Sequence, residues 1–396
     1  MCEVIGGGTP SKDKAHSAFY SGDIPWATVR DMKSDLISDT EFKITKEAVK
    51  ASSTNIIPKG NVVIATRVGL GKVCLIEHDT AINQDLRGVV PKDAGKLAVR
   101  FLFWWLKSVA QLIVKEGTGA TVQGVKLPFI KSLPIPTPPL PEQQRIVAIL
   151  DEAFEGIATA TANAEKNLNN ARELFKSYLQ SVFTNKGAGW VEKKLEDLCE
   201  IKHGFAFDGN DFTTSTDILK PIVITPGNFT EYGTLSFTDK NTKRFSGVPP
   251  ANFIFNQGDL VVVMTDLSSK MKILGRPALT EQDGVLHNQR IGRLVFNDNY
   301  LVTKFLYYFF LTQNYWDNIK RSATGTMVKH TAPKRILSNK LSFPNDLSEQ
   351  QAIVAKLDEL STETKKLEAI YQQKLALLTE LKKSLLQQAF SGALTH

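Results

Sequence analysis

The sequence has few of the features that mark secreted, membrane or metal-binding proteins. Its 396 residues include three cysteines, Cys2, Cys74 and Cys199, and this odd number at distant positions predicts reduced thiols in a cytoplasmic protein. The nearest candidate for a membrane helix, residues 101–106, is far shorter than the ~20 residues required. The opening residues have neither the basic nor the apolar region of a secretory signal. We therefore expect no membrane partner.

Motifs for catalysis are also scarce. The six histidines show no His-x-x-x-His spacing and no Cys-x-x-Cys pair occurs, so no metal site is predicted. Gly69-Leu-Gly-Lys72 lacks the first glycine and the final Ser or Thr of a phosphate-binding loop. Glu192-Lys-Lys194 resembles half of a nuclease motif but has no suitable aspartate before it, so we interpret it as surface charge. There is no Asn/Asp-Pro-Pro-aromatic run of the kind that adenine methyltransferases use. The sequence predicts no catalytic residues.

The sequence does contain a long internal repeat. Residues 140–183 and 347–390 align without a gap at an offset of 207 residues, with 19 identities in 44 positions. The first copy opens with Leu140-Pro-Glu-Gln-Gln and the second with Leu347-Ser-Glu-Gln-Gln. A repeat of this length indicates duplication of a structural unit, so we expect two related halves.

Both copies are predicted to be long helices. Neither contains proline after its second residue, and Gly156 is the only glycine. Apolar residues follow a heptad pattern, rich in alanine in the first copy and in leucine in the second, which favours an antiparallel coiled coil within the chain. Two unrelated amphipathic helices, or a coiled coil between two chains, are the alternatives. The predicted contact residues are Leu150, Ile157, Leu174, Tyr178, Leu357, Leu360, Leu367, Tyr371, Leu378, Leu381 and Leu385.

The segments before the helices are related more weakly. The β-branched run 61–65 corresponds to 259–264, and both predict buried strands that end in polar loops. The aromatic segments 98–113 and 301–319 have helical periodicity, and we interpret them as core rather than as base-stacking platforms. Residues 190–198 have no counterpart before Cys2, so we expect either a lost opening strand or a chain that starts late.

The excess positive charge lies in these segments. Residues 1–139 carry a net charge of +5 and residues 184–346 carry +4, whereas the helices carry −2 and 0. A polyanionic partner would therefore contact the globular segments, and the helices would act as a spacer. Ordinary surface charge is the alternative, because these values are small.

Candidate DNA contacts lie in loops and where the two halves differ. Asn83-Gln84 and Asn288-Gln289 could pair with adenine, but both halves share them, so we favour a structural role. The small polar loops that begin at Thr118 and Thr324 suit close approach to phosphates, or are tight turns. The candidate DNA-binding residues are Arg30, Lys33, Arg67, Lys72, Thr118, Thr121, Lys243, Arg244, Lys270, Lys272, Thr324 and Thr326.

The whole chain resembles the specificity subunit of a type I restriction–modification system. The resemblance rests on the duplicated Glu-Gln-Gln segment, on Gly-Asn-Val-Val-Ile-Ala and Gly-Asp-Leu-Val-Val-Val, on Asn-Gln, and on the closing Ser-Leu-Leu-Gln-Gln-Ala-Phe-Ser-Gly. It implies an α/β (α+β) fold, in which two globular target-recognition domains are joined by two long antiparallel coiled-coil helices in a pseudo-twofold repeat. The implied boundaries are 1–139 and 187–346 for the domains, 140–186 for the first helix, and 347–396 for the second helix with a C-terminal tail.

The resemblance also implies a function. Each domain would read one half of a bipartite, asymmetric site in double-stranded DNA, and the helices would set the spacing and dock methyltransferase (modification) subunits. Restriction (translocase) subunits would complete the complex. S-adenosylmethionine, ATP and Mg²⁺ are expected on the partner subunits, with no cofactor on this chain. A modification-only or other defence complex, an enzyme with unfamiliar motifs, and a coiled-coil scaffold that does not bind DNA are the alternatives.

Overall fold

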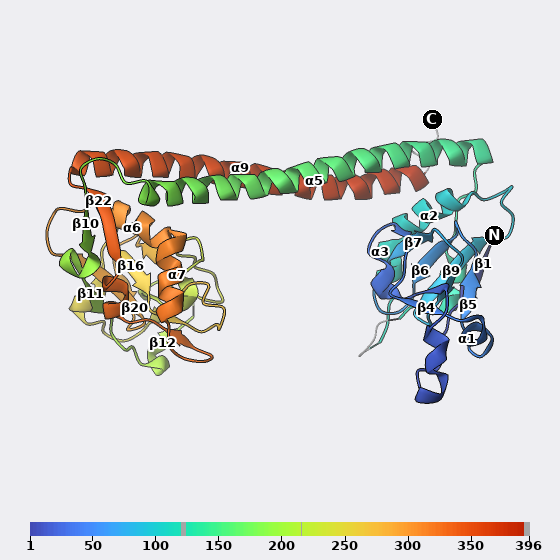
Figure 1. The fold of residues 1–396 in the computed structure, drawn as a ribbon, viewed down its shortest axis with the longest axis horizontal. Helices are drawn as coiled ribbons and strands as arrows, with labels where there is room; N and C mark the ends of the chain where they lie inside the picture. Colours follow the sequence, from blue (N-terminus) through green and yellow to red (C-terminus); the bar gives the residue numbers. More distant parts are fainter. Residues whose placement is uncertain (120–123, 215, 392–396) are drawn as a thin grey trace. The chain divides into compact units, whose positions relative to one another are not determined.

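The computed structural model describes residues 1–119, 124–214 and 216–391 (Figure 1). The chain forms two compact units, one of Met1–Lys166 with Gln372–His396 and the other of Asn167–Tyr371. Each unit contains one globular domain and parts of the two long helices α5 (Leu140–Thr184) and α9 (Leu347–Phe390). We call residues 1–139 domain 1 and residues 187–346 domain 2.

Domain 1 is built on two sheets, with strand orders β1-β9-β6-β7-β3 and β4-β2-β8-β5. All pairs are antiparallel except β2 with β8 and β3 with β7. The central strand β6 is buried along its whole length, as its β-branched sequence predicts. The strands are β1 (Cys2–Gly6), β2 (Ile24–Ala27), β3 (Leu36–Ile37), β4 (Phe42–Ile44), β5 (Asn55–Ile57), β6 (Val62–Ala65), β7 (Val73–Ile76), β8 (Thr80–Ile82) and β9 (Leu86–Pro91).

Domain 2 repeats this arrangement. Its sheets β11-β20-β16-β18 and β12-β14-β13-β19-β15 match β1-β9-β6-β7 and β4-β2-β8-β5, except that β12 is added and β3 has no counterpart. The strands are β11 (Cys199–His203), β12 (Phe212–Thr213), β13 (Ile222–Ile224), β14 (Lys243–Phe245), β15 (Ile254–Phe255), β16 (Leu260–Val263), β18 (Pro277–Leu279), β19 (Val285–His287) and β20 (Ile291–Phe296). Two ribbons are further additions, β10 (Trp190–Lys194) with β22 (Lys340–Pro344) and β17 (Thr265–Asp266) with β21 (Lys329–His330).

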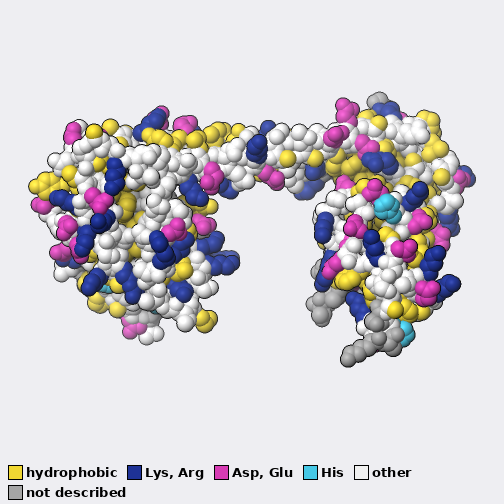
Figure 2. Space-filling model, in the orientation of Figure 1, with side chains coloured by type: hydrophobic (Ala, Val, Ile, Leu, Met, Phe, Trp, Pro, Cys, Tyr) yellow, Lys and Arg dark blue, Asp and Glu magenta, His cyan; other side chains and the backbone are white. Residues whose placement is uncertain are grey.

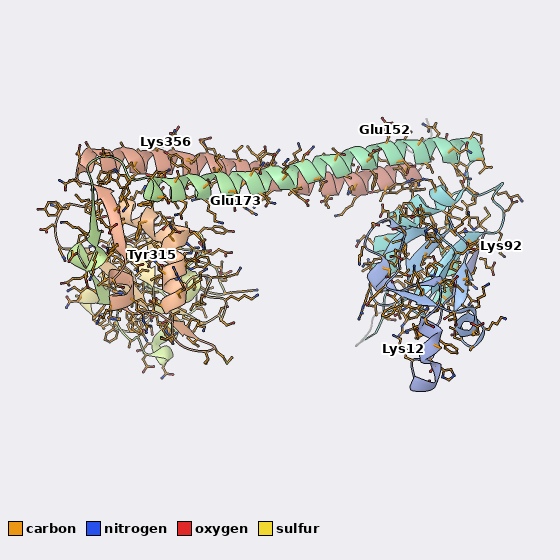
Figure 3. The ribbon with its side chains drawn as sticks, viewed as in Figure 1. Lys12, Lys92, Glu152, Glu173, Tyr315 and Lys356 are labelled. Carbon is orange, nitrogen blue, oxygen red and sulfur yellow. The ribbon has the colours of Figure 1, made fainter. Side chains whose placement is uncertain are left out.

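The aromatic segments form helices that cover the sheet β1-β9-β6-β7-β3 in domain 1 and the sheet β11-β20-β16-β18 in domain 2. Helices α2 (Val99–Ser108) and α3 (Ala110–Lys115) do so in domain 1, and α6 (Thr303–Leu311) and α7 (Gln313–Ser322) in domain 2. Phe101 and Phe305 are fully buried, and Tyr315 of α7 lies inside domain 2 (Figure 3). The prediction that these aromatic residues form core is confirmed. The remaining helices are α1 (Lys46–Lys50), α4 (Leu127–Ser132) and α8 (Pro333–Leu337).

The two long helices run antiparallel within each unit. In the unit that holds domain 2, Arg172 of α5 pairs with Glu368 of α9 at 2.9 Å, while Leu179 packs in the same cluster as Leu357. In the other unit, Leu150 shares a cluster with Ala389. The predicted mixed α/β fold with an internal repeat and two long antiparallel helices is therefore confirmed.

A glutamine at the start of each long helix joins it to its domain. The buried Gln143 side chain donates to the carbonyl oxygens of Lys96 and Pro138 and accepts from the Ala98 N–H, at 2.8–2.9 Å. The buried Gln350 side chain donates to the carbonyl oxygens of Tyr300 and Pro344 and accepts from the Val302 N–H, also at 2.8–2.9 Å. The repeated Glu-Gln-Gln motif thus supplies the same joint twice.

A second joint lies two helical turns further along. Asp151 accepts hydrogen bonds from Trp104 Nε1 at 2.8 Å and from Arg100. Asp358 accepts from the Tyr308 hydroxyl at 2.6 Å and from Lys304. Lys304 thus takes the place of Arg100, and Tyr308 takes the place of Trp104. Each replacement keeps a hydrogen-bond donor to the aspartate.

Not every predicted contact residue of the helices is buried. Leu150, Ile157 and Leu357 are, whereas Leu360, Tyr371, Leu378 and Leu385 are half-buried. Leu174, Tyr178, Leu367 and Leu381 are 36–52% exposed. Near the end of α5 the buried face instead carries Leu179, whose neighbours Phe175 and Phe183 pack against the aromatic core of domain 2. A straight α-helix has about 3.6 residues per turn and drifts away from a strict seven-residue repeat. The face that packs on the domain therefore differs from the face that the heptad positions define.

Candidate nucleic-acid interface

A backbone hydrogen-bond network holds three loops together at the end of strand β6 in domain 1. The Thr66 N–H donates to the Asp85 carbonyl, and the Val125 N–H donates to the Thr66 carbonyl, both at 2.9 Å. Thr118 and Gly124 exchange N–H···O bonds of 2.9 and 3.0 Å, which close a hairpin. Segments far apart in the sequence therefore meet at one strand end.

Domain 2 has the same network at the end of strand β16. The Met264 N–H donates to the Arg290 carbonyl and the Thr331 N–H donates to the Met264 carbonyl, again both at 2.9 Å. Thr324 and His330 exchange bonds of 2.9 and 3.0 Å. We call this network the strand-end frame. These four bonds recur in both domains, whereas domain 2 adds the β17–β21 pairing of Thr265 with His330 and of Asp266 with Lys329.

The Asn-Gln motif shapes one of the three loops. Asn83 Oδ1 accepts the Asp85 N–H at 3.2 Å, and Asn288 Oδ1 accepts the Arg290 N–H at 3.0 Å. Both asparagines are buried. An asparagine that accepts from the N–H two residues ahead fixes a tight turn. The asparagines therefore have the structural role that the sequence predicts.

In domain 1 the frame carries an ion pair. Arg67 is the second residue after β6. Its guanidinium lies 3.5 Å from the Asp85 carboxylate. That carboxylate also accepts from Asn83 Nδ2 at 3.1 Å. Burial and the positive charge of Arg67 lower the pKa of Arg87, which donates to the Gln84 and Leu86 carbonyls. Two guanidinium groups and one carboxylate thus give this strand end a net positive charge.

In domain 2 the charges occupy different positions of the frame. Thr265 stands where domain 1 has Arg67, and its hydroxyl lies 3.1 Å from His330 Nδ1. Arg290 stands where domain 1 has Asp85, and its side chain is exposed. That side chain makes no ion pair or hydrogen bond with any residue in the described ranges. Of the two pairs of equivalent positions, 67 with 265 and 85 with 290, each domain therefore carries one arginine, on a different loop.

The hairpins contribute backbone and hydroxyl groups. Thr324 Oγ1 accepts from Arg335 at 3.1 Å, Lys329 donates to the Gly325 carbonyl at 2.7 Å, and Thr326 is exposed. Gly325 has a φ of 94°, and a Cβ there would clash with the Val328 carbonyl, so the turn requires glycine. In domain 1, Thr118 forms the base of the hairpin. The predicted contact Thr121 lies outside the described residues.

The predicted cations of domain 1 lie beside its frame. Lys72 Nζ donates to the Met32 carbonyl at 3.2 Å, which joins the turn after β6 to the 3-10 helix at Val29–Asp31 and its neighbour Lys33. Arg30 is exposed and lies 3.7 Å from Glu41. The structure thus brings Arg30, Lys33 and Lys72 together.

The predicted cations of domain 2 fall into two sets. Lys270 and Lys272 lie in the loop after β17, where Lys272 pairs with Glu231 at 3.5 Å. Lys243 and Arg244 lie on β14 of the other sheet. The Lys243 ammonium lies 5.2 Å from the Phe212 ring centre, and Arg244 donates to the Lys220 carbonyl. Figure 2 shows lysine and arginine side chains on the face of domain 2 that carries α7.

Sequence reasoning missed several residues of the frame, namely Asp85, Arg87, Arg290, His330 and Arg335. A signal was present, because the residue after the shared Asn-Gln is aspartate in one half and arginine in the other. Within the described residues no group of three His, Cys, Asp or Glu side chains could hold a metal ion. None of the described helices is long and apolar enough to cross a membrane.

Sequence comparisons relate both halves of the chain to one protein family. The family model described as "Type I restriction modification DNA specificity domain" matches residues 1–170 and 187–376. The MjaIX specificity subunit of Methanocaldococcus jannaschii is 29% identical over 219 residues, or 51% of this chain and 50% of the relative. The EcoR124I/EcoR124II specificity subunit of Escherichia coli is 32% identical over 185 residues, or 45% of each chain. The alignments thus span about half the length of these curated relatives.

Solved structures share the fold. The HsdS subunit from Thermoanaerobacter tengcongensis matches with a TM-score of 0.60 at 18% identity, over 99% of this chain and 97% of the other. A chain from a structure on complex assembly of a type I R-M system matches with a TM-score of 0.74 at 18% identity, over 98% and 97%. With a family model that matches in two stretches and covers most of the sequence, the chain belongs to the family of type I restriction–modification DNA specificity domains.

Proposed function

We propose that this chain is the sequence-recognition subunit of a type I restriction–modification complex, and that each domain reads one half of a bipartite, asymmetric DNA site. The observation that carries the proposal is the strand-end frame, which recurs with the same hydrogen bonds in both domains but bears different side chains. A shared backbone with divergent side chains suits two readers of the same polymer that select different bases.

Charge supports DNA as the ligand. Segments 1–139 and 184–346 carry all of the net positive charge, and Lys33, Lys72 and Lys270 are exposed near the frames. Lysine and arginine contacts to phosphates supply most of the sequence-independent affinity, so binding would weaken as salt rises. The exposed hydroxyl of Thr326, in the domain 2 hairpin, is one that we expect to approach a phosphate.

The helices suit a spacer and a docking surface. Helix α5 continues without a break for 45 residues and α9 for 44. We propose that their length sets the distance between the half-sites. Large apolar side chains on α9, among them Ile370 and Leu377, are 56% and 61% exposed. Exposed apolar residues on a helix are typical of protein interfaces, and we assign them to the methyltransferase subunits.

The proposal places catalysis on other chains. Methyltransferase subunits would bind S-adenosylmethionine and modify adenine, and restriction (translocase) subunits would use ATP and Mg²⁺. This chain would bind no cofactor and would have no activity alone. A modification-only or other defence complex requires the same role of this chain.

The test is genome-wide mapping of methylated adenine in cells that express the chain with its methyltransferase subunits, compared with cells that express the methyltransferase alone. We expect one bipartite motif that depends on this chain. Absence of any motif would contradict the proposal and would favour a scaffold that does not read DNA. Methylation or cleavage by the purified chain alone would instead indicate an enzyme.

A further inference from the structure

The strand-end frame contains two positions in each domain whose backbone is fixed by hydrogen bonds. Each position in domain 1 has an equivalent in domain 2. In domain 1 the pair is Arg67 and Asp85, and in domain 2 it is Thr265 and Arg290. From the equivalence of these pairs, which rests on the proposed function, we propose that Arg67 and Arg290 are specificity-determining residues and that each reads one guanine in its own half-site.

The backbone of Arg290 is fixed on both sides. Its N–H donates to Asn288 Oδ1 at 3.0 Å, and its carbonyl accepts from the Met264 N–H at 2.9 Å. Because Asn288 is buried, the anchor of this turn is not open to solvent. A residue with a fixed backbone and a free side chain loses little backbone entropy when it binds, which favours a specific contact.

The Arg290 side chain has no competing partner among the described residues. Most other arginines of domain 2 are engaged: Arg276 is buried against Trp316, Arg293 pairs with Asp259, and Arg335 donates to Thr324. An exposed guanidinium on a fixed turn can offer two parallel N–H groups, which match the O6 and N7 acceptors of guanine in the major groove.

Domain 1 presents its arginine from the neighbouring loop. Arg67 follows the end of β6, and the Asp85 carboxylate lies 3.5 Å from its guanidinium. Asn83 Nδ2 holds that carboxylate in turn, at 3.1 Å. Asp85 therefore acts as a positioning residue, because it orients Arg67 while leaving half of the arginine side chain exposed, 49%. The arginine is carried by different loops in the two frames, so the guanines are expected at different positions within the two half-sites.

The experiment compares three full-length variants expressed with the methyltransferase subunits. Arg290→Gln and Arg67→Gln remove the guanidinium and keep a polar side chain, and Lys270→Gln removes an exposed charge outside the frame. We expect Arg290→Gln to relax one guanine in a single half-site, with a loss of roughly 5- to 150-fold in discrimination at that base. Arg67→Gln should do the same in the other half-site, whereas Lys270→Gln should weaken binding without changing the motif.

The role of Asp85 needs a separate readout. Asp85→Asn keeps the size of the side chain and removes the ion pair, so discrimination at the base read by Arg67 should fall while the second half-site stays unchanged. Thermal unfolding of each variant checks folding, and Arg290→Lys provides a second substitution that retains the charge but not the paired N–H groups. A motif unchanged in Arg290→Gln and Arg67→Gln, or an equal loss at all bases, would overturn the inference. This result differs from failure of the proposed function. In that case the unmodified chain itself would give no bipartite motif.

Discussion

Gln350 of helix α9 makes the same three hydrogen bonds in domain 2 that Gln143 of helix α5 makes in domain 1. Both side chains are fully buried. Each side chain bonds the loop before an aromatic helix and the segment before its own long helix. One residue therefore fixes the position of each domain on its long helix.

Loss of this joint should be costly. Gln350→Ala leaves the Val302 N–H and two carbonyl groups without a partner, and we expect the free energy of unfolding to fall by roughly 3 kcal/mol. Urea denaturation measures the change. Gln351→Ala is the matched control, since Gln351 is the next residue and is exposed. Equal effects of the two substitutions would show that the buried hydrogen bonds do not stabilise the domain.

The second joint gives a smaller effect. Tyr308→Phe removes the hydroxyl that donates to Asp358 at 2.6 Å and leaves the buried ring in place. Because the acceptor is charged, the loss should be about 1–2 kcal/mol in unfolding free energy. The control is Glu359→Gln, which removes an exposed ion pair with Lys356 and should change stability by less than about 0.5 kcal/mol. A Tyr308→Phe protein as stable as the control would contradict this assignment.

The hairpin of domain 2 depends on Gly325. Gly325→Ala places a Cβ against the Val328 carbonyl at a φ of 94°, so the turn must distort. We expect roughly 10-fold weaker binding to the domain 2 half-site, measured by titration of the complex with DNA. Gly209→Ala is the control, because a Cβ there meets no atom within 4 Å. Unchanged affinity in Gly325→Ala would place this hairpin away from the DNA.

His287 makes the stability of domain 2 sensitive to acid. Burial lowers the pKa of its imidazole to about 4, although its ring bonds the Ile291 carbonyl at 2.8 Å. The unfolded chain binds a proton near pH 6.5 and the folded chain does not, so this contribution is complete above pH 6.5 and is lost as pH falls toward 4. At pH 5 the loss should be about 2 kcal/mol. Urea denaturation at pH 7 and pH 5 should show it in the unmodified chain and much less in His287→Gln. Identical pH dependence in both would contradict the burial of a neutral His287.

Local patterns made much of the fold predictable. The long helices follow from periodicity and from the absence of proline, and the repeated segments 140–183 and 347–390 differ from α5 and α9 by one residue at most. The buried strands follow from β-branched runs, since a strand covered on both faces needs apolar side chains throughout. The exposure of Leu174 could not be predicted in this way, because it depends on the domain that packs beside the helix.

The candidate site was less accessible from sequence. Thr66, Asp85 and Val125 meet through backbone hydrogen bonds, which depend on chain geometry rather than on side-chain identity. Cationic residues such as Arg67 stand out in a sequence, whereas the fixed backbone of Arg290 appears only once the Met264 bond is known. The asparagines of the shared Asn-Gln were correctly assigned to structure, because both halves contain them and each fixes a turn.

The proposed spacer role gives a test of helix length. Inserting four residues into both long helices, after Lys166 in α5 and after Tyr371 in α9, should extend each by about 6 Å. At roughly 3.4 Å per base pair, the spacer in the methylated motif should lengthen by about two base pairs, with both half-sites unchanged. Mapping methylated adenine measures the spacer directly. Four residues inserted into the loop between Gly187 and Ala188 form the control, because that segment belongs to no helix and should leave the spacer as it was. A spacer that stays the same in the helix variant, in a complex that still methylates DNA, would show that the helices do not set the distance between the half-sites.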